Sequence, residues 1–148
     1  KPLGTVGGLN SYKRKFKKTF FVTNCDIIID IDYHDLYRFH KKNKNYITLV
    51  ASAKDFKIPY GVCNLDNNGQ LSKISEKPKQ NVLANTGLYV LEPEALDLIP
   101  KKKLYHMTQL IHDARKKNKR IGIYPISETS WLDVGEWSEY RKTLKKIP

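Results

Sequence analysis

The sequence predicts an α/β fold, because short apolar runs typical of buried strands alternate with longer amphipathic stretches typical of helices. The first run, residues 20–29, is almost continuously apolar, as expected for a strand covered on both faces. Residues 36–40 follow with apolar side chains at helical spacing, and residues 46–53 form the next apolar run. This order of strand, helix and strand indicates a sheet flanked by helices.

Capping and turn residues place the next boundaries. Asp32 or Asp35 is expected to cap the first helix, since an aspartate side chain accepts hydrogen bonds from the free N–H groups there. Residues 62–65 and 71–76 are predicted strands joined by Asp66-Asn67-Asn68-Gly69. Asn and Gly tolerate the positive φ that such a turn requires, so this segment predicts a hairpin.

The remaining elements continue the same alternation. A strand is predicted at 86–91, and a short helix at 93–99 begins with a proline in its first turn. Residues 107–117 predict an amphipathic helix, 121–126 a strand and 136–144 a final helix. With no internal repeat, low-complexity tract or flexible linker, residues 1–148 are expected to form a single domain.

Length and cysteine usage narrow the class of protein. A chain of 148 residues is long enough to bury a core, and no apolar run approaches the ~20 residues of a membrane span. Cys25 and Cys63 lie in predicted strand regions without the spacing of a disulfide framework. These features predict a protein of the reducing cytoplasm, away from membranes, with Cys25 a buried structural thiol.

The net charge of +12 raises the question of nucleic-acid binding. The basic residues are spread over predicted helix ends and loops, and no helix-turn-helix, zinc-finger or RNA-binding signature accompanies them. We therefore expect a solvated basic surface and no nucleic-acid partner. A positive field also favours anionic substrates.

Two aspartates are the strongest candidates for chemistry. Asp26 follows an apolar run, and Asp133 lies between an aromatic residue and a glycine in Trp131-Leu132-Asp133-Val134-Gly135. Mg²⁺ prefers oxygen ligands, keeps several waters and is commonly bound through one or two carboxylates plus substrate phosphates. Asp26 and Asp133 are therefore predicted to hold Mg²⁺. The structural alternative is that both aspartates only cap the elements that follow them.

Six short motifs resemble, in their order and spacing, those of the sugar-phosphate nucleotidylyltransferases. The motifs are Leu3-Gly4-Thr5-Val6-Gly7-Gly8-Leu9, Asn24-Cys25-Asp26, Tyr60-Gly61-Val62, Glu76-Lys77-Pro78, Asn85-Thr86-Gly87 and Trp131-Leu132-Asp133-Val134-Gly135. Enzymes of that family join a nucleoside triphosphate to a sugar 1-phosphate and release pyrophosphate. The resemblance implies a Rossmann-like, GT-A-like mixed sheet flanked by helices, with Mg²⁺ as cofactor.

The family's N-terminal glycine-rich loop, which ends in an arginine and wraps the triphosphate, has no match here. We therefore expect this chain to be about the C-terminal two-thirds of a catalytic domain, with its N-terminal strands missing and no activity on its own. The strand at 20–29 would then have an exposed edge, which is a pairing hazard. It is expected to pair with the absent segment or with a second copy in a homo-oligomer.

The resemblance also implies a role for each motif. Asp26, Lys77 and Asp133 would be catalytic, with Lys77 on the sugar 1-phosphate. Glu76 would accept hydrogen bonds from sugar hydroxyls and Trp131 would wall the sugar pocket. The remaining substrate-binding residues would be Gly4, Thr5, Gly7 and Gly8 at the base and ribose, and Tyr60, Gly61, Asn85, Thr86 and Gly87 at the sugar.

The chain departs from the family at two positions. Cys25 stands where many members have glycine, and Trp137 stands where a Thr-Pro pair is frequent. The closest variety, which in some proteins follows a pair of CBS regulatory modules, implies guanylyl transfer to a mannose- or amino-sugar phosphate.

Two other functions stay open. Asp30-Ile31-Asp32 matches the metal motif of glycosyltransferases, in which Asp30 and Asp32 would hold the cation. The chain could also be a non-catalytic module that binds a sugar phosphate.

Overall fold

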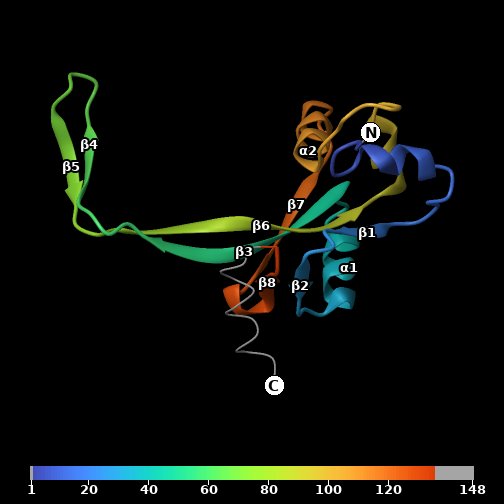
Figure 1. Ribbon diagram of the computed structural model, residues 1–148, viewed down its shortest axis with the longest axis horizontal. Coiled ribbons are helices and arrows are strands. Elements are labelled where there is room, and N and C mark those ends of the chain that lie inside the picture. The colour runs from blue at the N-terminus through green and yellow to red at the C-terminus, as the bar shows by residue number, and fades with distance from the viewer. Residues whose placement is uncertain (1, 136–148) are drawn as a thin grey trace.

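The computed structural model describes residues 2–135. Its largest sheet has the strand order β1 (Phe20–Thr23), β6 (Lys79–Leu91), β3 (Ile47–Lys57) and β7 (Ile121–Ile126). β6 is antiparallel to both β1 and β3, whereas β3 and β7 are parallel. This mixed sheet confirms the predicted α/β class (Figure 1).

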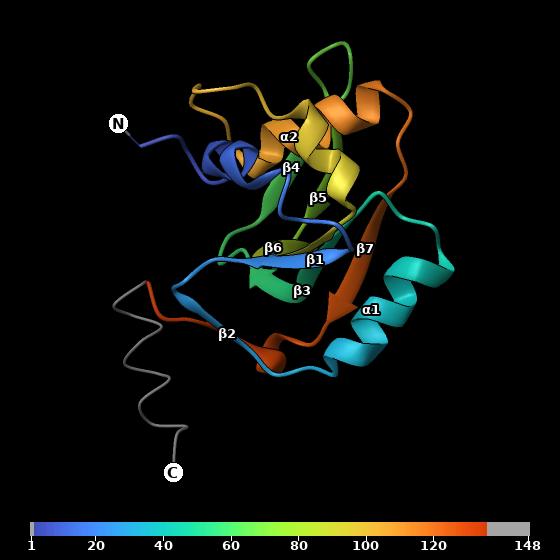
Figure 2. The same cartoon turned by 90° about the vertical axis from the view of Figure 1, so that its right-hand side faces the viewer.

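The two helices pack on opposite faces of this sheet (Figure 2). Helix α1 (Tyr33–Lys42) covers one face and α2 (Met107–Lys116) the other. Alternate residues of a strand point to opposite faces. Accordingly, Val90 packs in the apolar cluster that contains Leu36 of α1 (the α1 cluster), and its neighbour Leu91 packs in the cluster that contains Leu110 of α2 (the α2 cluster).

The predicted cap of the first helix is confirmed at Asp32. Its carboxylate accepts hydrogen bonds from the backbone N–H groups of His34 at 2.7 Å and Asp35 at 3.2 Å. The hydrogen bonds from Asp35 and then His34 lower the pKa of Asp32. Three short 3₁₀ helices complete the helical content of the described residues: η1 (Gly7–Tyr12), η2 (Pro93–Leu98) and η3 (Glu128–Ser130).

The single strand predicted at 20–29 is wrong. The run divides into β1 and β2 (Ile27–Ile29), and β2 pairs with β8 (Trp131–Asp133) in a separate two-stranded ribbon. The division falls at Asn24-Cys25-Asp26, where polar residues form a turn. β1 is not buried on both faces, because its residues alternate between half-buried and exposed, so that one face of the strand is open.

A long arm extends from the body of the molecule (Figure 1). Its base is formed by the far ends of β3 and β6, which run beyond the predicted strands, and its tip by the hairpin of β4 (Val62–Leu65) and β5 (Leu71–Ser75). The predicted hairpin is therefore confirmed.

No helix of the described residues is long and apolar enough to cross a membrane. The helix predicted at 136–144 lies outside the described residues.

Candidate active site

The β2–β8 ribbon brings Asp26 and Asp133 together. Ile27 lies opposite Asp133 in the ribbon, and the N–H of Val134 donates a hydrogen bond to the backbone carbonyl of Asp26 at 2.9 Å. Both carboxylates crowd the same point beside Gly135. A Cβ on that glycine would lie 3.0 Å from Asp26 Oδ2 and 3.3 Å from Asp133 Oδ1. Two segments far apart in the sequence thus form one acidic pair.

The environment of this acidic pair suits a divalent cation. The N–H of Gly135 donates to Asp133 Oδ1 at 3.0 Å, which fixes one carboxylate. Among the described residues, neither Asp26 nor Asp133 belongs to an ion pair, and no third acidic, histidine or cysteine side chain completes a metal cluster. Two uncompensated carboxylates side by side are the donor set that Mg²⁺ uses together with water and phosphate oxygens. The residues present therefore fit this ion.

Gly87 fastens the turn that carries Asp26 to the main sheet. β6 bulges here, because Leu49 pairs with Tyr89 whereas Ala51 pairs with Asn85. Gly87 adopts a φ of +90°, and its carbonyl accepts a hydrogen bond from the N–H of Asn24 at 3.1 Å. A Cβ at Gly87 would lie 2.8 Å from Asn24 Nδ2, so only glycine fits. The bulge therefore sets the position of the Asn24-Cys25-Asp26 turn.

The neighbours of Gly87 serve the sheet itself. The Thr86 side chain is buried, and its hydroxyl donates to the carbonyl of Val50 at 2.9 Å. Asn85 donates from its Nδ2 to the Tyr89 hydroxyl at 2.6 Å. Of the Asn85-Thr86-Gly87 motif, Gly87 is the residue that accepts a hydrogen bond from the turn of the acidic pair.

Trp131 lies on the same face of β8 as Asp133, two residues away. The indole is half-buried against the α1 cluster, and its Nε1–H is buried with no acceptor among the described residues. The ammonium of Lys54 lies 4.5 Å from the centroid of the Trp131 ring. Sequence reasoning missed Lys54, whose only signal was a cation within the run 47–54 of otherwise uncharged residues.

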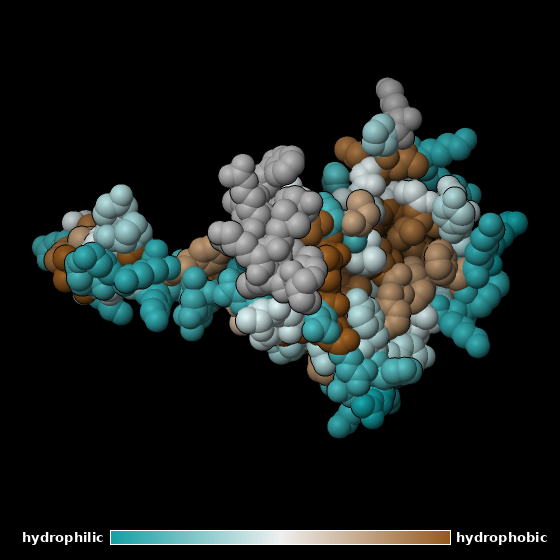
Figure 3. All heavy atoms as spheres, turned by 60° about the horizontal axis from the view of Figure 1, so that its bottom comes forward, coloured by the Kyte–Doolittle hydropathy of each residue, from teal (hydrophilic) through white to brown (hydrophobic). Residues whose placement is uncertain are grey.

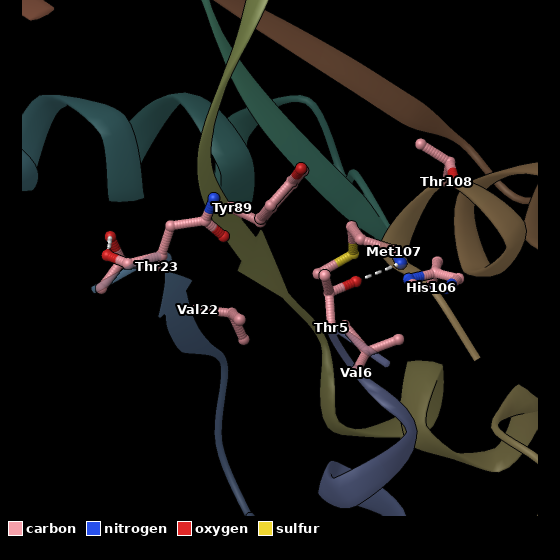
Figure 4. Close-up of a pocket in the computed structure, with 9 residues that line it drawn as sticks. Thr5, Val6, Val22, Thr23, Tyr89, His106, Met107 and Thr108 are labelled. Atoms are coloured by element: carbon pink, nitrogen blue, oxygen red, sulfur yellow. Dashed lines mark hydrogen bonds between the residues drawn. The ribbon is translucent and has the colours of Figure 1, made fainter. Parts of the chain in front are cut away.

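A pocket of about 270 Å³ opens beside Asn24, between β1 and the N-terminal segment (Figure 4). The Thr5 hydroxyl accepts a hydrogen bond from the N–H of Met107 at 2.9 Å, and the N–H groups of Val6 and Gly7 both donate to the carbonyl of Tyr105 at 3.2 Å. These bonds hold the glycine-rich segment against the start of α2. Figure 3 shows an apolar area on the body, rimmed by hydrophilic side chains.

The lining residues of this pocket come from four parts of the chain: Thr5, Val6, Val22, Thr23, Asn24, Tyr89, His106, Met107 and Thr108. Of the glycine-rich segment, Thr5 therefore lines the pocket, whereas Gly4 and Gly8 do not.

Tyr60, Gly61, Glu76 and Lys77 form a second group at the base of the hairpin. A Cβ at Gly61 would lie 3.2 Å from Glu76 Oε2, and the Lys77 ammonium lies 3.8 Å from Glu76 Oε1. At roughly 3.3 Å per residue, the β6 segment from Lys79 to Gly87 spans roughly 25 Å. The structure therefore does not bring Lys77 to the acidic pair.

Two further sequence interpretations change with the structure. Cys25 is exposed, so the expected buried thiol is wrong, because residues 24–26 form a turn and not a strand interior; Cys63 in β4 is exposed as well. Asp32, one of the two aspartates of the glycosyltransferase motif, uses its carboxylate to cap α1. This competes with the metal role that motif requires.

Comparison with known proteins identifies the family. A family model described as nucleotidyl transferase matches residues 1–148. The chain is 34% identical over 147 residues to mannose-1-phosphate guanyltransferase 2 of Candida glabrata. The matched region covers 94% of this chain and 40% of the relative. It is 27% identical over 157 residues to UTP–glucose-1-phosphate uridylyltransferase of Synechocystis, with 99% and 40% covered.

Solved structures share the fold. HddC from Yersinia pseudotuberculosis superimposes with a TM-score of 0.71 at 20% identity, covering 100% of this chain and 64% of that one. HddC complexed with GMP-PN gives a TM-score of 0.69 at 18% identity with the same coverage. The chain belongs to the nucleotidyl transferase family, as the order of its six motifs predicted. It spans about 40% of the curated relatives it matches.

Proposed function

We propose that this protein is a sugar-1-phosphate nucleotidylyltransferase, which condenses a nucleoside triphosphate with a sugar 1-phosphate to give a nucleotide sugar and pyrophosphate. The observation that carries the proposal is the acidic pair, in which Asp26 and Asp133 crowd one point with no cation from the described residues. The family and the activities for which the relatives are named support the same reaction.

The chemistry explains why such a pair is needed. An oxygen of the sugar phosphate attacks the α-phosphorus of the nucleotide, and pyrophosphate leaves, so anions have to be brought together. Catalysis then rests on positioning and on charge neutralisation. Asp26 and Asp133 would hold Mg²⁺, which supplies positive charge to phosphate oxygens when bound. The chain's own part is to position the ligands: the Gly135 N–H orients Asp133, and the Gly87–Asn24 contact fixes the turn before Asp26.

The pocket beside Asn24 is the proposed nucleotide side of the site. It adjoins the turn that carries Asp26, and Thr5 of the glycine-rich segment lines it. We assign the base and ribose to this side, with Gly4 and Gly8 holding the segment in place. The relatives' names include both a guanyltransferase and a uridylyltransferase, and the HddC complex contains GMP-PN. Guanylyl transfer to a mannose- or amino-sugar phosphate is therefore the first pairing to test.

Lys77 and Glu76 remain a prediction for the sugar phosphate that rests on the family resemblance. In the structure their side chains face each other on the arm. The two exposed thiols, unpaired among the described residues, fit the reducing, cytoplasmic setting that we propose for this enzyme.

The test is an assay of pyrophosphate release by the full-length protein with Mg²⁺, four nucleoside triphosphates and a panel of sugar 1-phosphates. GTP with mannose 1-phosphate is the first pair. Asp26→Asn and Asp133→Asn should each abolish release, since each removes one ligand charge. Asp30→Asn is the matched control, because Asp30 is an exposed aspartate next to the same ribbon and outside the acidic pair. Full activity of Asp26→Asn, or loss in Asp30→Asn alone, would overturn the assignment.

A further inference from the structure

Lys54 occupies an unusual place in β3. Alternate strand residues share a face, so Lys54 lies on the face of Val50 and Ser52, which is the face that α1 and the β2–β8 ribbon cover. Its neighbours Ala53 and Asp55 are exposed, whereas Lys54 is half-buried. The strand therefore directs this one cation inward, toward the ribbon.

The ribbon meets Lys54 with Trp131. The Lys54 ammonium lies 4.5 Å from the ring centroid, a distance at which a cation and an indole attract each other. Trp131 and Asp133 lie on the same face of β8, at a spacing of about 6.6 Å between alternate strand residues. The indole thus holds the ammonium on the side of the ribbon that carries one member of the acidic pair.

Lys54 and the two aspartates on this side of the ribbon form no ion pairs within the described residues. Among the described residues, Lys54 forms no ion pair with a carboxylate, and neither Asp26 nor Asp133 forms one with a lysine or arginine. A lysine held against Trp131, on the strand face that carries Asp133, and without an ion pair of its own stays available to an anion that comes with its own cation. A phosphate bound through a divalent metal has that chemistry.

We propose that Lys54 binds the phosphate of the sugar 1-phosphate, with Trp131 holding its ammonium in place. The inference rests on the proposed function and assigns it a residue that the six motifs do not contain. Lys77, the lysine that the resemblance assigns to this phosphate, lies on the arm at the far end of β6. Lys54, by contrast, lies against Trp131, two residues from Asp133 on the same face of β8.

The experiment compares Lys54→Met, which keeps the aliphatic stem, Lys54→Arg, which keeps the charge, and Lys57→Met as the matched control. Lys57 is an exposed lysine of the same strand. The full-length protein is assayed for kcat and for the KM of each substrate. Binding is measured separately by the fluorescence of Trp131, with Trp137 and any other tryptophan of the full-length protein replaced by Phe. Sugar 1-phosphates and inorganic phosphate are the titrants, each with Mg²⁺.

Lys54→Met is expected to raise the KM of the sugar 1-phosphate at least tenfold and to shift the fluorescence midpoint equally, with the KM of the nucleotide within twofold of wild type. Lys54→Arg should recover most of the loss, and Lys57→Met should match wild type. An unchanged KM and midpoint in a folded Lys54→Met protein would overturn the inference, as would a lower melting temperature with unchanged binding.

The two proposals fail in different ways. Turnover by the wild type with no effect at Lys54 removes only the inference. Absence of turnover with every substrate pair, together with phosphate binding that Lys54→Met abolishes, removes the transferase and retains Lys54 as a phosphate-binding residue.

Discussion

The nitrogen of Val134 lies 2.9 Å from the carbonyl oxygen of Asp26, and this backbone hydrogen bond joins the two halves of the acidic pair. It continues the β2–β8 ribbon by one step beyond the pairing of Ile27 with Asp133. Backbone pairing, and not contact between the side chains, therefore decides how far apart the two carboxylates lie. Changes in the backbone around the turn should affect the site more than most changes in the side chains that surround it.

Gly87→Ala tests this dependence. An alanine would have to adopt a φ of +90° with its Cβ 2.8 Å from Asn24 Nδ2, so we expect a loss of stability of roughly 1–3 kcal/mol together with a loss of activity. Gly69→Ala is the matched control, because Gly69 has a φ of +79° but open space around its Cβ. It should lose stability only, by about 1–2 kcal/mol. Urea denaturation and pyrophosphate release separate the two effects, and equal activity losses would contradict the interpretation.

Stability is expected to fall in mild acid because of His40. Its side chain has no exposed surface, with Nδ1 at 2.8 Å from Thr48 Oγ1 and Nε2 at 3.2 Å from Glu92 Oε1. Burial lowers the pKa of His40 below its ordinary value of 6.5, and the hydrogen bond with Glu92 offsets only part of this shift. The unfolded chain therefore binds the proton more readily, so stability is lost as the pH falls below about 6.5.

We expect the free energy of unfolding to drop between pH 7 and 5.5 through this group. Glu92 adds to the loss only at lower pH. Its burial raises its pKa, but the hydrogen bonds from Lys41, Thr19 and His40 outweigh that effect and bring the pKa below 4.5. His40→Gln should flatten the pH 5.5–7 dependence measured by denaturation, whereas His34→Gln on the exposed face of α1 should leave it intact. A steep dependence that persists in His40→Gln would exclude this histidine as the cause.

Cys25 should make the proposed transferase activity sensitive to alkylation. Its thiol is exposed and adjoins Asp26, so a bulky maleimide adduct there would obstruct the acidic pair. In a Cys63→Ser background we expect activity to fall more than tenfold on modification, with protection by substrate and Mg²⁺. The reciprocal Cys25→Ser protein, modified at Cys63 on the arm, should keep its activity. Equal inactivation of both proteins would point to a general effect of the reagent.

The edge of β1 is expected to support self-association of the 148-residue chain. Within the described residues β1 pairs only with β6, which leaves one side of the strand open, and Phe21 on it is 40% exposed. Phe21→Lys places a charge on that edge and should shift sedimentation toward the monomer. Thr19→Lys, just before the strand, serves as the charge control. A monodisperse wild-type monomer at high concentration would rule out pairing through this edge.

Local signals in the sequence predicted much of the fold. Asp32 precedes a helix because its carboxylate can accept the first free N–H groups, and Asp66-Asn67-Asn68-Gly69 makes a hairpin because Asn and Gly tolerate its geometry. The break in the run 20–29 was missed because apolar content alone cannot show that a strand changes sheets. The polar residues Asn24 and Asp26 were the available signal.

The site was predictable in part. The acidic pair followed from the order of the motifs, and the structure supplies the proximity of Asp26 and Asp133 that spacing in the sequence could not establish. Lys54 could not be found in this way, since its place depends on which strand face the ribbon covers. The separation of Lys77 from the acidic pair likewise depends on the length of the arm. β3 and β6 run beyond the predicted strands through polar residues, so the sequence did not indicate how long the arm is.

The origin of the acidic pair in two distant strands has a consequence during synthesis. At ~5–20 residues/s, the ribosome adds Asp133 roughly 5–20 s after Asp26. Throughout that interval the nascent chain contains β2 without its only partner strand among the described residues, and it carries one member of the acidic pair. A chain that is released before Asp133 is added therefore lacks the second carboxylate. Formation of the acidic pair has to wait until β8 has been synthesised.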